Sequence, residues 1–130
     1  MNLIVCVDDR MGMAFNKRRQ SRDRVVIEDI ARLTDGYLLG MDPRSEKLFE
    51  GLSMNITSLE DSDRCDYVFL EFMHPSKLSA EPSRIILYRW NRHYPADVHF
   101  DLLLDHYHCT QTREFPGSSH ETITREVYEK

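Results

Sequence analysis

Four short apolar segments, separated by stretches of helical character, constrain the fold of this chain most. They cover residues 3–7, 37–39, 67–70 and 85–88. Continuous apolar runs of this length are typical of strands that are buried on both faces. Strands that alternate with helical segments predict right-handed crossover connections. We therefore expect a mostly parallel sheet flanked by helices.

Two of the connecting segments carry signals for the start of a helix. Residues 25–33 place their apolar side chains on one helical face and their charged side chains on the other. Asp23 suits the N-cap position of this helix, because its carboxylate can accept a free backbone N–H of the first turn. A second helix is expected over residues 43–49. Asp42 would be its cap and Pro43 its first residue, where a missing N–H costs nothing.

The C-terminal part of the chain follows a different pattern. Residues 107–112 and 122–128 alternate between apolar and polar side chains, and a Pro-Gly pair marks a turn between them. This pattern predicts an antiparallel hairpin at one edge of the sheet. Residues 55–66 are polar and acidic and are expected to form a loop. The sequence thus predicts a single α/β domain over residues 1–130, with a twisted, mostly parallel sheet and a C-terminal hairpin.

Charge, hydropathy and cysteine content exclude several classes of protein. The net charge of −5 argues against general nucleic-acid binding, which needs a basic face. No apolar run approaches the roughly 20 residues that span a bilayer, and the N-terminus does not resemble a signal peptide. Cys6, Cys65 and Cys109 are odd in number and widely spaced. This spacing argues against a disulfide framework and predicts a cytoplasmic location.

A basic segment at residues 16–24, NKRRQSRDR, stands out in this acidic chain. It lies between the first strand and the first helix, where open α/β sheets usually bind their ligand. The guanidinium groups of Arg18, Arg19 and Arg22 could bind a phosphate or carboxylate in bidentate fashion. Asp23 could cap the helix, orient the arginines or relay a proton. The alternative is a solvated basic loop that pairs with nearby acids, because runs of charge usually lie at the surface.

A second candidate segment, residues 88–94, interleaves aromatic side chains with cations. Such segments can stack bases or other rings through π and cation–π contacts. Trp90 is therefore a candidate wall of a ligand pocket. The alternative is that Trp90 packs into the core at the end of a strand while the neighbouring arginines cover it.

A third candidate is the run of histidines and aspartates at residues 99–108. Its possible ligands for zinc or manganese are His99, Asp101, Asp105, His106 and His108. Their spacing matches no established metal motif, and hydrogen-bonded or exposed histidines are the commoner outcome. A metal-dependent hydrolase of the ribonuclease Z type would carry an HxHxDH motif on a much longer chain. Neither property is found here.

The sequence indicates no nucleophile for covalent catalysis. Cys6 lies inside the first apolar segment, where a thiol is expected to be buried and unreactive. Ser118 and Ser119 precede His120, but neighbouring residues on a turn do not form a catalytic triad. We therefore assign no catalytic residue from the sequence.

Several segments, in order along the chain, resemble dihydrofolate reductase. Residues 3–13, LIVCVDDRMGM, are similar to that family's first strand and the start of its mobile active-site loop. Asp23 falls where the family keeps the acid that binds the pteridine ring. Residues 38–41 resemble its second strand with the following glycine, residues 84–100 its fifth strand and next loop, and residues 118–130 its last strand. The resemblance implies a dihydrofolate reductase-like fold.

Departures from the family's pattern bear on its activity. Residues 18–20 stand where the reductase loop has a Pro-Trp pair, and Met41 and Pro43 replace residues that grip the cofactor pyrophosphate. Residues 70–72, LEF, replace a Gly-Gly pair that lets the dinucleotide approach the backbone. The resemblance thus implies that the fold is kept while the NADPH site is lost, and no cofactor is predicted.

These observations lead to one functional hypothesis and two alternatives. The hypothesis is a divergent, non-catalytic dihydrofolate reductase-like domain that binds a small anionic ligand, with a phosphate or carboxylate group. Its predicted ligand-binding residues are Arg18, Arg19, Arg22, Asp23 and Trp90. The first alternative is an enzyme, either a divergent NADPH-dependent reductase or a metal-dependent hydrolase. The second is a protein-interaction module whose basic loop docks on an acidic partner.

Overall fold

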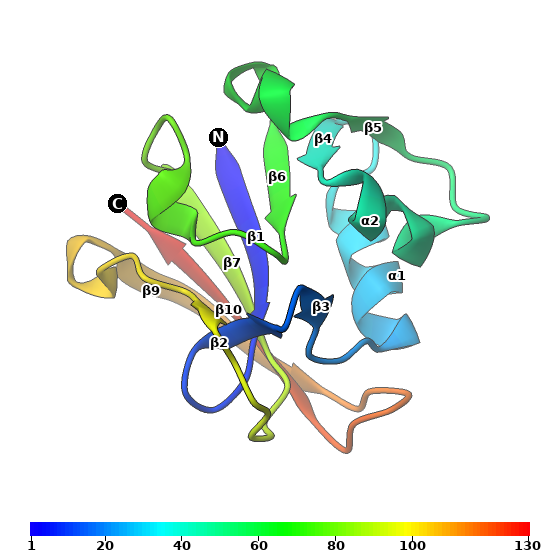
Figure 1. The fold of residues 1–130 in the computed structure, drawn as a ribbon, viewed down its shortest axis with the longest axis vertical. Helices are drawn as coiled ribbons and strands as arrows, with labels where there is room; N and C mark the ends of the chain where they lie inside the picture. The colour runs from blue at the N-terminus through cyan, green and yellow to red at the C-terminus, as the bar shows by residue number, and fades with distance from the viewer.

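The computed structural model, which describes all 130 residues, contains a seven-stranded mixed sheet with the order β5-β4-β6-β1-β7-β10-β9 (Figure 1). Neighbouring strands from β5 to β7 are parallel. Strand β10 is antiparallel to both β7 and β9. The mixed α/β architecture, with a mostly parallel sheet and an antiparallel C-terminal hairpin, is as the sequence predicts.

The boundaries of the elements follow. The strands of the large sheet are β1 (Asn2–Val7), β4 (Leu38–Met41), β5 (Asn55–Thr57), β6 (Tyr67–Leu70), β7 (Arg84–Arg89), β9 (His108–Phe115) and β10 (Ile123–Glu129). A small sheet with the order β3-β2-β8 consists of β2 (Gly12–Phe15), β3 (Arg18–Arg19) and β8 (Val98–His99). The helices are α1 (Arg24–Leu33), α2 (Pro43–Glu46) and the 3₁₀ helices η1 (Lys47–Phe49), η2 (Leu59–Arg64), η3 (Pro75–Lys77) and η4 (Leu104–His106).

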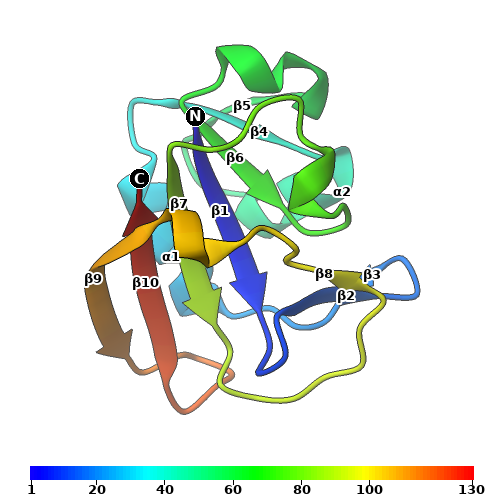
Figure 2. The same cartoon turned by 90° about the vertical axis from the view of Figure 1, so that its left-hand side faces the viewer.

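Each face of the large sheet has its own hydrophobic core. Val26 and Ile30 of α1 pack on one face, together with Phe49 of η1. Met13 of β2 and Phe100, after β8, pack on the other face. Figure 2 shows α1 behind the sheet, and both termini lie at the same end of the sheet in the two views. No helix is long and apolar enough to cross a membrane.

The predicted helix starts are confirmed. The Asp23 carboxylate caps α1 by accepting the Val25 N–H at 2.9 Å. The Asp42 carboxylate caps α2 by accepting the Arg44 N–H at 2.8 Å. The second helix, however, is not continuous over residues 43–49, because it changes from one α-helical turn to the 3₁₀ helix η1.

Two segments that the sequence assigned to loops contain regular structure. Residues 55–66 hold the edge strand β5 and the helix η2. The basic segment forms a β-hairpin, in which β2 and β3 pair across a turn at Asn16 and Lys17. Both turn residues have positive φ, 51° and 63°, as a two-residue hairpin turn requires.

Candidate functional site

The carboxyl ends of the parallel strands are the natural place for a site in this topology. Strand β4 is the next strand of the large sheet after β1 in the chain, and it lies two places away from β1 on one side. Strand β7, which follows β6, lies on the other side of β1. Ligands of open α/β sheets bind in the crevice beyond the strand ends at such a switch point. The basic hairpin and the first residues of α1 and α2 follow these strand ends in the chain.

One cavity at this edge, called the basic pocket below, is lined almost entirely by cations. Its volume is about 420 Å³. The lining residues are Lys17, Arg18, Arg19, Arg44, Lys47 and Phe72. They come from the β2–β3 hairpin, from α2 and η1, and from the segment after β6. The pocket thus brings together three parts of the chain that are distant in sequence.

Arg19 belongs to the wall of the basic pocket. Its Nε and Nη2 donate to the two carboxylate oxygens of Glu71 at 2.9 and 3.0 Å, which is a bidentate ion pair. The Ser45 hydroxyl donates to the same carboxylate at 2.7 Å. Glu71 is only 9% exposed, so both of its oxygens are paired within the protein. Arg19 is therefore held in place and its charge is balanced.

Arg44 of α2 also lines the basic pocket. Its Nε donates to the Asp42 carboxylate at 3.0 Å, and its guanidinium carbon lies 4.0 Å from the centre of the Phe72 ring. The second contact is a cation–π interaction. The hydrogen bond from Arg44 lowers the pKa of the Asp42 carboxyl despite the opposing effect of partial burial. Asp42 in turn raises the pKa of Arg44, so both groups stay charged.

The other three cations of the basic pocket have no such partners. Lys17, Arg18 and Lys47 are exposed and make no ion pair in the structure. Three positive charges therefore face one cavity without compensation. This arrangement can bind the oxygens of a phosphate or carboxylate by charge-assisted hydrogen bonds.

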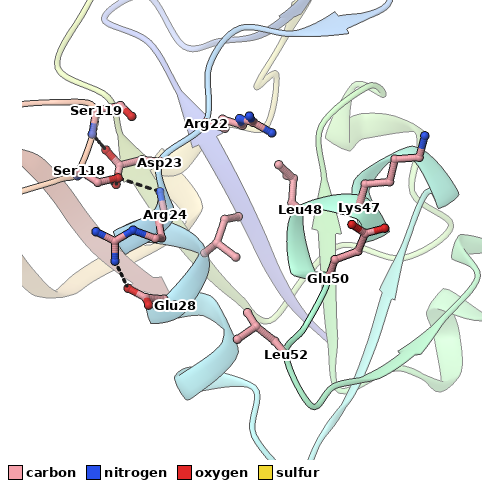
Figure 3. A pocket seen from close by; sticks show the side chains of 11 residues that line it. Arg22, Asp23, Arg24, Glu28, Lys47, Leu48, Glu50, Leu52, Ser118 and Ser119 are labelled. Carbon is pink, nitrogen blue, oxygen red and sulfur yellow. Dashed lines mark hydrogen bonds and ion pairs between the residues drawn. The ribbon is translucent and has the colours of Figure 1, made fainter.

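A second cavity, called the helix pocket below, lies beside the N-terminus of α1 (Figure 3). Its volume is also about 420 Å³. Leu48 and Leu52 give it an apolar side, and Arg24 is paired with Glu28 at 3.2 Å. Lys47 lines both cavities, so the helix pocket and the basic pocket are neighbours.

Asp23 lies at one end of the helix pocket, where its side chain is fully buried. Its carboxylate accepts five hydrogen bonds, of 2.8–3.1 Å, from Val25 N, Ser118 N, Ser118 Oγ, Ser119 N and His120 Nδ1. Burial alone would raise the pKa of this carboxyl, but the hydrogen bonds outweigh burial and hold the pKa well below its usual range. Asp23 is therefore ionised and fully satisfied within the protein.

His120 extends this arrangement to two hydroxyl groups. Its Nε2 lies 3.1 Å from both Ser21 Oγ and Tyr94 Oη. Trp90 stacks on the imidazole, with ring centres 4.7 Å apart and an interplanar angle of 20°. We call Asp23, His120, Ser21, Tyr94 and Trp90 the Asp23–His120 network.

The structure separates the residues that the sequence assigned to one ligand site. Arg18 and Arg19 line the basic pocket, whereas Arg22 and Asp23 line the helix pocket. Asp23 accepts no hydrogen bond from an arginine, so it acts as a helix cap and does not orient these side chains. Trp90 is 4% exposed and belongs to the hydrophobic core on the α1 face of the sheet. It lines neither of these two pockets, but with Asn91 and Arg92 it contributes to the lining of a third cavity.

The histidines and aspartates of residues 99–108 do not come together. Asp101 instead accepts hydrogen bonds from the backbone N–H and the hydroxyl of Ser76. His106 lies in η4 and His108 begins β9, so the two do not share a strand face. No group of three or more His, Cys, Asp or Glu side chains in the structure is placed to hold a metal ion.

Sequence reasoning missed the partners that complete both arrangements. Lys47 and Phe72 reach the basic pocket from distant segments, and His120 meets Asp23 across 97 positions of sequence. One signal was present in Gly117: a side chain there would collide with the Asp23 carboxylate. The turn at residues 116–119 therefore needs glycine so that it can approach the Asp23 carboxylate closely. A Pro-Gly pair in the sequence predicts a turn but does not identify this partner.

Comparison with known proteins adds no assignment to this geometry. No family model matches the chain, and no curated protein matches it in sequence. The arrangement offers two chemical capacities: a cluster of uncompensated cations that can hold an anion, and a buried carboxylate–imidazole pair next to two hydroxyls.

Proposed function

We propose that this chain is a cytoplasmic, dihydrofolate reductase-like domain that binds a small anionic ligand, bearing a phosphate or carboxylate, in the basic pocket. One observation carries the proposal. Lys17, Arg18 and Lys47 face a single cavity without an acidic partner, while two ion pairs hold the wall behind them. Of the five ligand-binding residues predicted from the sequence, only Arg18 and Arg19 line this pocket, which Lys47 of η1 completes.

The balance of charge favours an anion in this pocket. Like charges that converge on one cavity repel each other, and an anion relieves that repulsion. Hydrogen bonds to charged groups contribute about 1.5–3 kcal/mol each. Because Arg19 and Arg44 are already fixed, little side-chain entropy is lost in the wall when a ligand binds. The net charge of −5 disfavours non-specific attraction of anions to the protein as a whole.

The order of elements supports the fold assignment within this proposal. The chain runs from β1 through the segment containing Gly12 to the Asp23-capped α1, and it ends in the β9–β10 hairpin. These are the features, in the same order, on which the resemblance to dihydrofolate reductase rests.

The segment after β6 supports loss of the NADPH site. Glu71 and Phe72 stand where the resemblance implies the glycine pair of a reductase. The Glu71 carboxylate is tied to Arg19 and Ser45, and the Phe72 ring is covered by Arg44. These side chains occupy the space that glycines would leave for a dinucleotide. We therefore propose that the domain has no hydride-transfer activity.

Thermal unfolding in the presence of anions tests the proposal. Pyrophosphate should raise the melting temperature above that in sodium chloride of equal ionic strength, because a ligand that binds the folded state stabilises it by mass action. Arg18→Ala and Lys47→Ala should reduce this shift to the level of the salt control. Arg113→Ala is the matched control, since Arg113 is an exposed cation on β9 outside the pocket.

Two results would contradict the proposal. An equal pyrophosphate shift in wild type and Lys47→Ala would place the anion elsewhere. The absence of any specific shift in wild type would leave the basic hairpin as a docking surface for an acidic protein. Separately, stabilisation by reduced nicotinamide together with folate would contradict the loss of the cofactor site.

A further inference from the structure

The Asp23–His120 network connects a serine hydroxyl, an imidazole and a carboxylate along one hydrogen-bonded path. Ser21 Oγ lies 3.1 Å from His120 Nε2, and His120 Nδ1 lies 3.0 Å from Asp23 Oδ2. This is the connectivity by which an imidazole activates a serine hydroxyl. The basic pocket contains none of these three residues, so anion binding there does not account for their arrangement.

The ionised Asp23 carboxylate decides the tautomer of His120. A carboxylate has no hydrogen to donate, so the 3.0 Å contact requires that Nδ1 carries the hydrogen. The lone pair of the neutral ring is then on Nε2 and points at the two hydroxyls. His120 is thereby prepared to accept a proton from Ser21, which is the role of a general base.

The imidazole is held rigidly in this orientation. Its side chain is 1% exposed, and the ring lies on the indole of Trp90. Tyr94 Oη is 3.1 Å from His120 Nε2 and 3.4 Å from Ser21 Oγ, so when Ser21 donates to the imidazole, Tyr94 can donate to Ser21. Preorganisation of this kind is what a base needs in order to act without rearrangement.

Ser21 is placed where a substrate can approach it. The residue is partly exposed, in contrast to the buried His120 and Asp23. The backbone N–H groups of Arg22 and Asp23 donate no hydrogen bond within the protein. The N–H of the residue after a nucleophilic serine commonly stabilises the oxyanion of acyl transfer. Two unpaired N–H groups therefore follow Ser21 directly in the chain.

We propose that Ser21 is a nucleophile for acyl transfer from small carboxylic esters, with His120 as its general base and Asp23 as a positioning residue. Ser21 Oγ forms a bond to the ester carbonyl carbon while its proton passes to His120 Nε2. The carbon–oxygen bond to the leaving group then breaks, and His120 returns the proton to the departing oxygen. Water attacks the acyl-Ser21 ester by the same route, releasing the acid and restoring the hydroxyl.

Acylation by p-nitrophenyl acetate tests this proposal on the full chain. We expect release of p-nitrophenolate and an acetyl group that peptide mass spectrometry maps to Ser21. Ser21→Ala should abolish that adduct, and because Ser21 is partly exposed this variant should fold. His120→Gln should slow the acylation of Ser21 by about 100-fold or more, as loss of a general base does.

Ser53→Ala is the matched control, since Ser53 is an exposed serine whose hydroxyl makes no hydrogen bond in the structure. Its p-nitrophenolate release and Ser21 adduct should equal those of wild type. Acetylation of wild type that is no faster at Ser21 than at Ser53 would overturn the proposal, and this comparison requires no variant. Equal Ser21 acylation in wild type and a folded His120→Gln protein, checked by its thermal melt, would also overturn it.

Discussion

Asp23 and Lys47 line the same helix pocket, yet their charged groups are in opposite situations. The Asp23 side chain is fully buried and accepts five hydrogen bonds from the protein. Lys47 is exposed and has no ion pair. A buried and satisfied charge is costly to disrupt but offers nothing further to a ligand, whereas an exposed charge contributes little to stability and is free to bind.

Glu71 lies between these two extremes. Its carboxylate is 9% exposed and paired, but its partner Arg19 is 26% exposed at the side chain. The Arg19–Glu71 pair therefore joins the wall of the basic pocket to the protein interior. At this edge of the sheet, buried and paired charges stabilise the fold, whereas exposed and unpaired charges are free to bind a ligand.

The largest effect is expected for Asp23→Ala. Removal of the carboxylate leaves the N-terminus of α1 without its cap and four further buried or partly buried donors without this acceptor. Loss of a helix cap costs about 0.5–2 kcal/mol, and each buried donor left without an acceptor costs about 1–3 kcal/mol. Urea denaturation should therefore measure a loss of at least about 3 kcal/mol in the free energy of unfolding. Asp35→Ala is the control at an exposed aspartate and should stay within about 0.5 kcal/mol of wild type. Equal losses in the two variants would contradict the comparison.

Acid pH should remove part of the same stabilisation. The folded state holds the pKa of Asp23 below its unfolded value of about 3.9. Its contribution is therefore complete above that pH and is lost as the pH falls toward the folded pKa. This loss can be measured by urea denaturation of wild type and Asp23→Asn at a series of pH values between about 6 and 2. The difference in unfolding free energy between them should narrow below about pH 4; a constant difference would contradict the assignment.

A smaller effect is expected for Glu71→Ala. The change leaves Arg19 and the Ser45 hydroxyl without their acceptor. Because Arg19 can be partly hydrated, we expect a loss of about 1.5–3 kcal/mol in the free energy of unfolding. The pyrophosphate shift should also weaken, since the wall of the basic pocket loses its fixed position. A loss as large as that of Asp23→Ala would mean that the wall is part of the core.

The smallest effect on stability is expected for Arg18→Ala and Lys47→Ala. Both side chains are exposed and unpaired, so the free energy of unfolding should change by less than about 0.5 kcal/mol. Urea denaturation without added anion would measure this. A destabilisation comparable to that of Glu71→Ala would show that these cations are structural, and it would remove the contrast with Asp23.

The sequence predicts the strands and helix caps well because their causes are local. Four apolar runs mark β1, β4, β6 and β7, and the capping aspartates occupy the positions where their carboxylates meet a free N–H. The strand β3 was missed because its pairing depends on positive φ at Asn16 and Lys17. An asparagine adopts positive φ readily, but a lysine does not, so the sequence at Lys17 does not indicate a turn.

The candidate site is less predictable because its contacts are long-range. All five cations of the basic pocket come from residues 17–19 and 44–47, which the β1–β4 crossover brings together; only the topology reveals this. The contact of His120 with Asp23 depends on the turn after β9, where Gly117 permits close approach. Ser118 and Ser119 are next to His120 in sequence, but they hydrogen-bond to Asp23. The serine hydroxyl that contacts His120 Nε2 is that of Ser21.

The most direct test of the account is a ¹⁵N-resolved NMR titration of the wild-type domain with pyrophosphate. Anion binding in the basic pocket should give saturable chemical-shift changes concentrated at the backbone amides of residues 17–19, 44–47 and 72, the parts of the chain that line the pocket. The same titration of Lys47→Ala should show them weakened or lost. Changes concentrated elsewhere, or none while the protein remains folded, would contradict anion binding in this pocket.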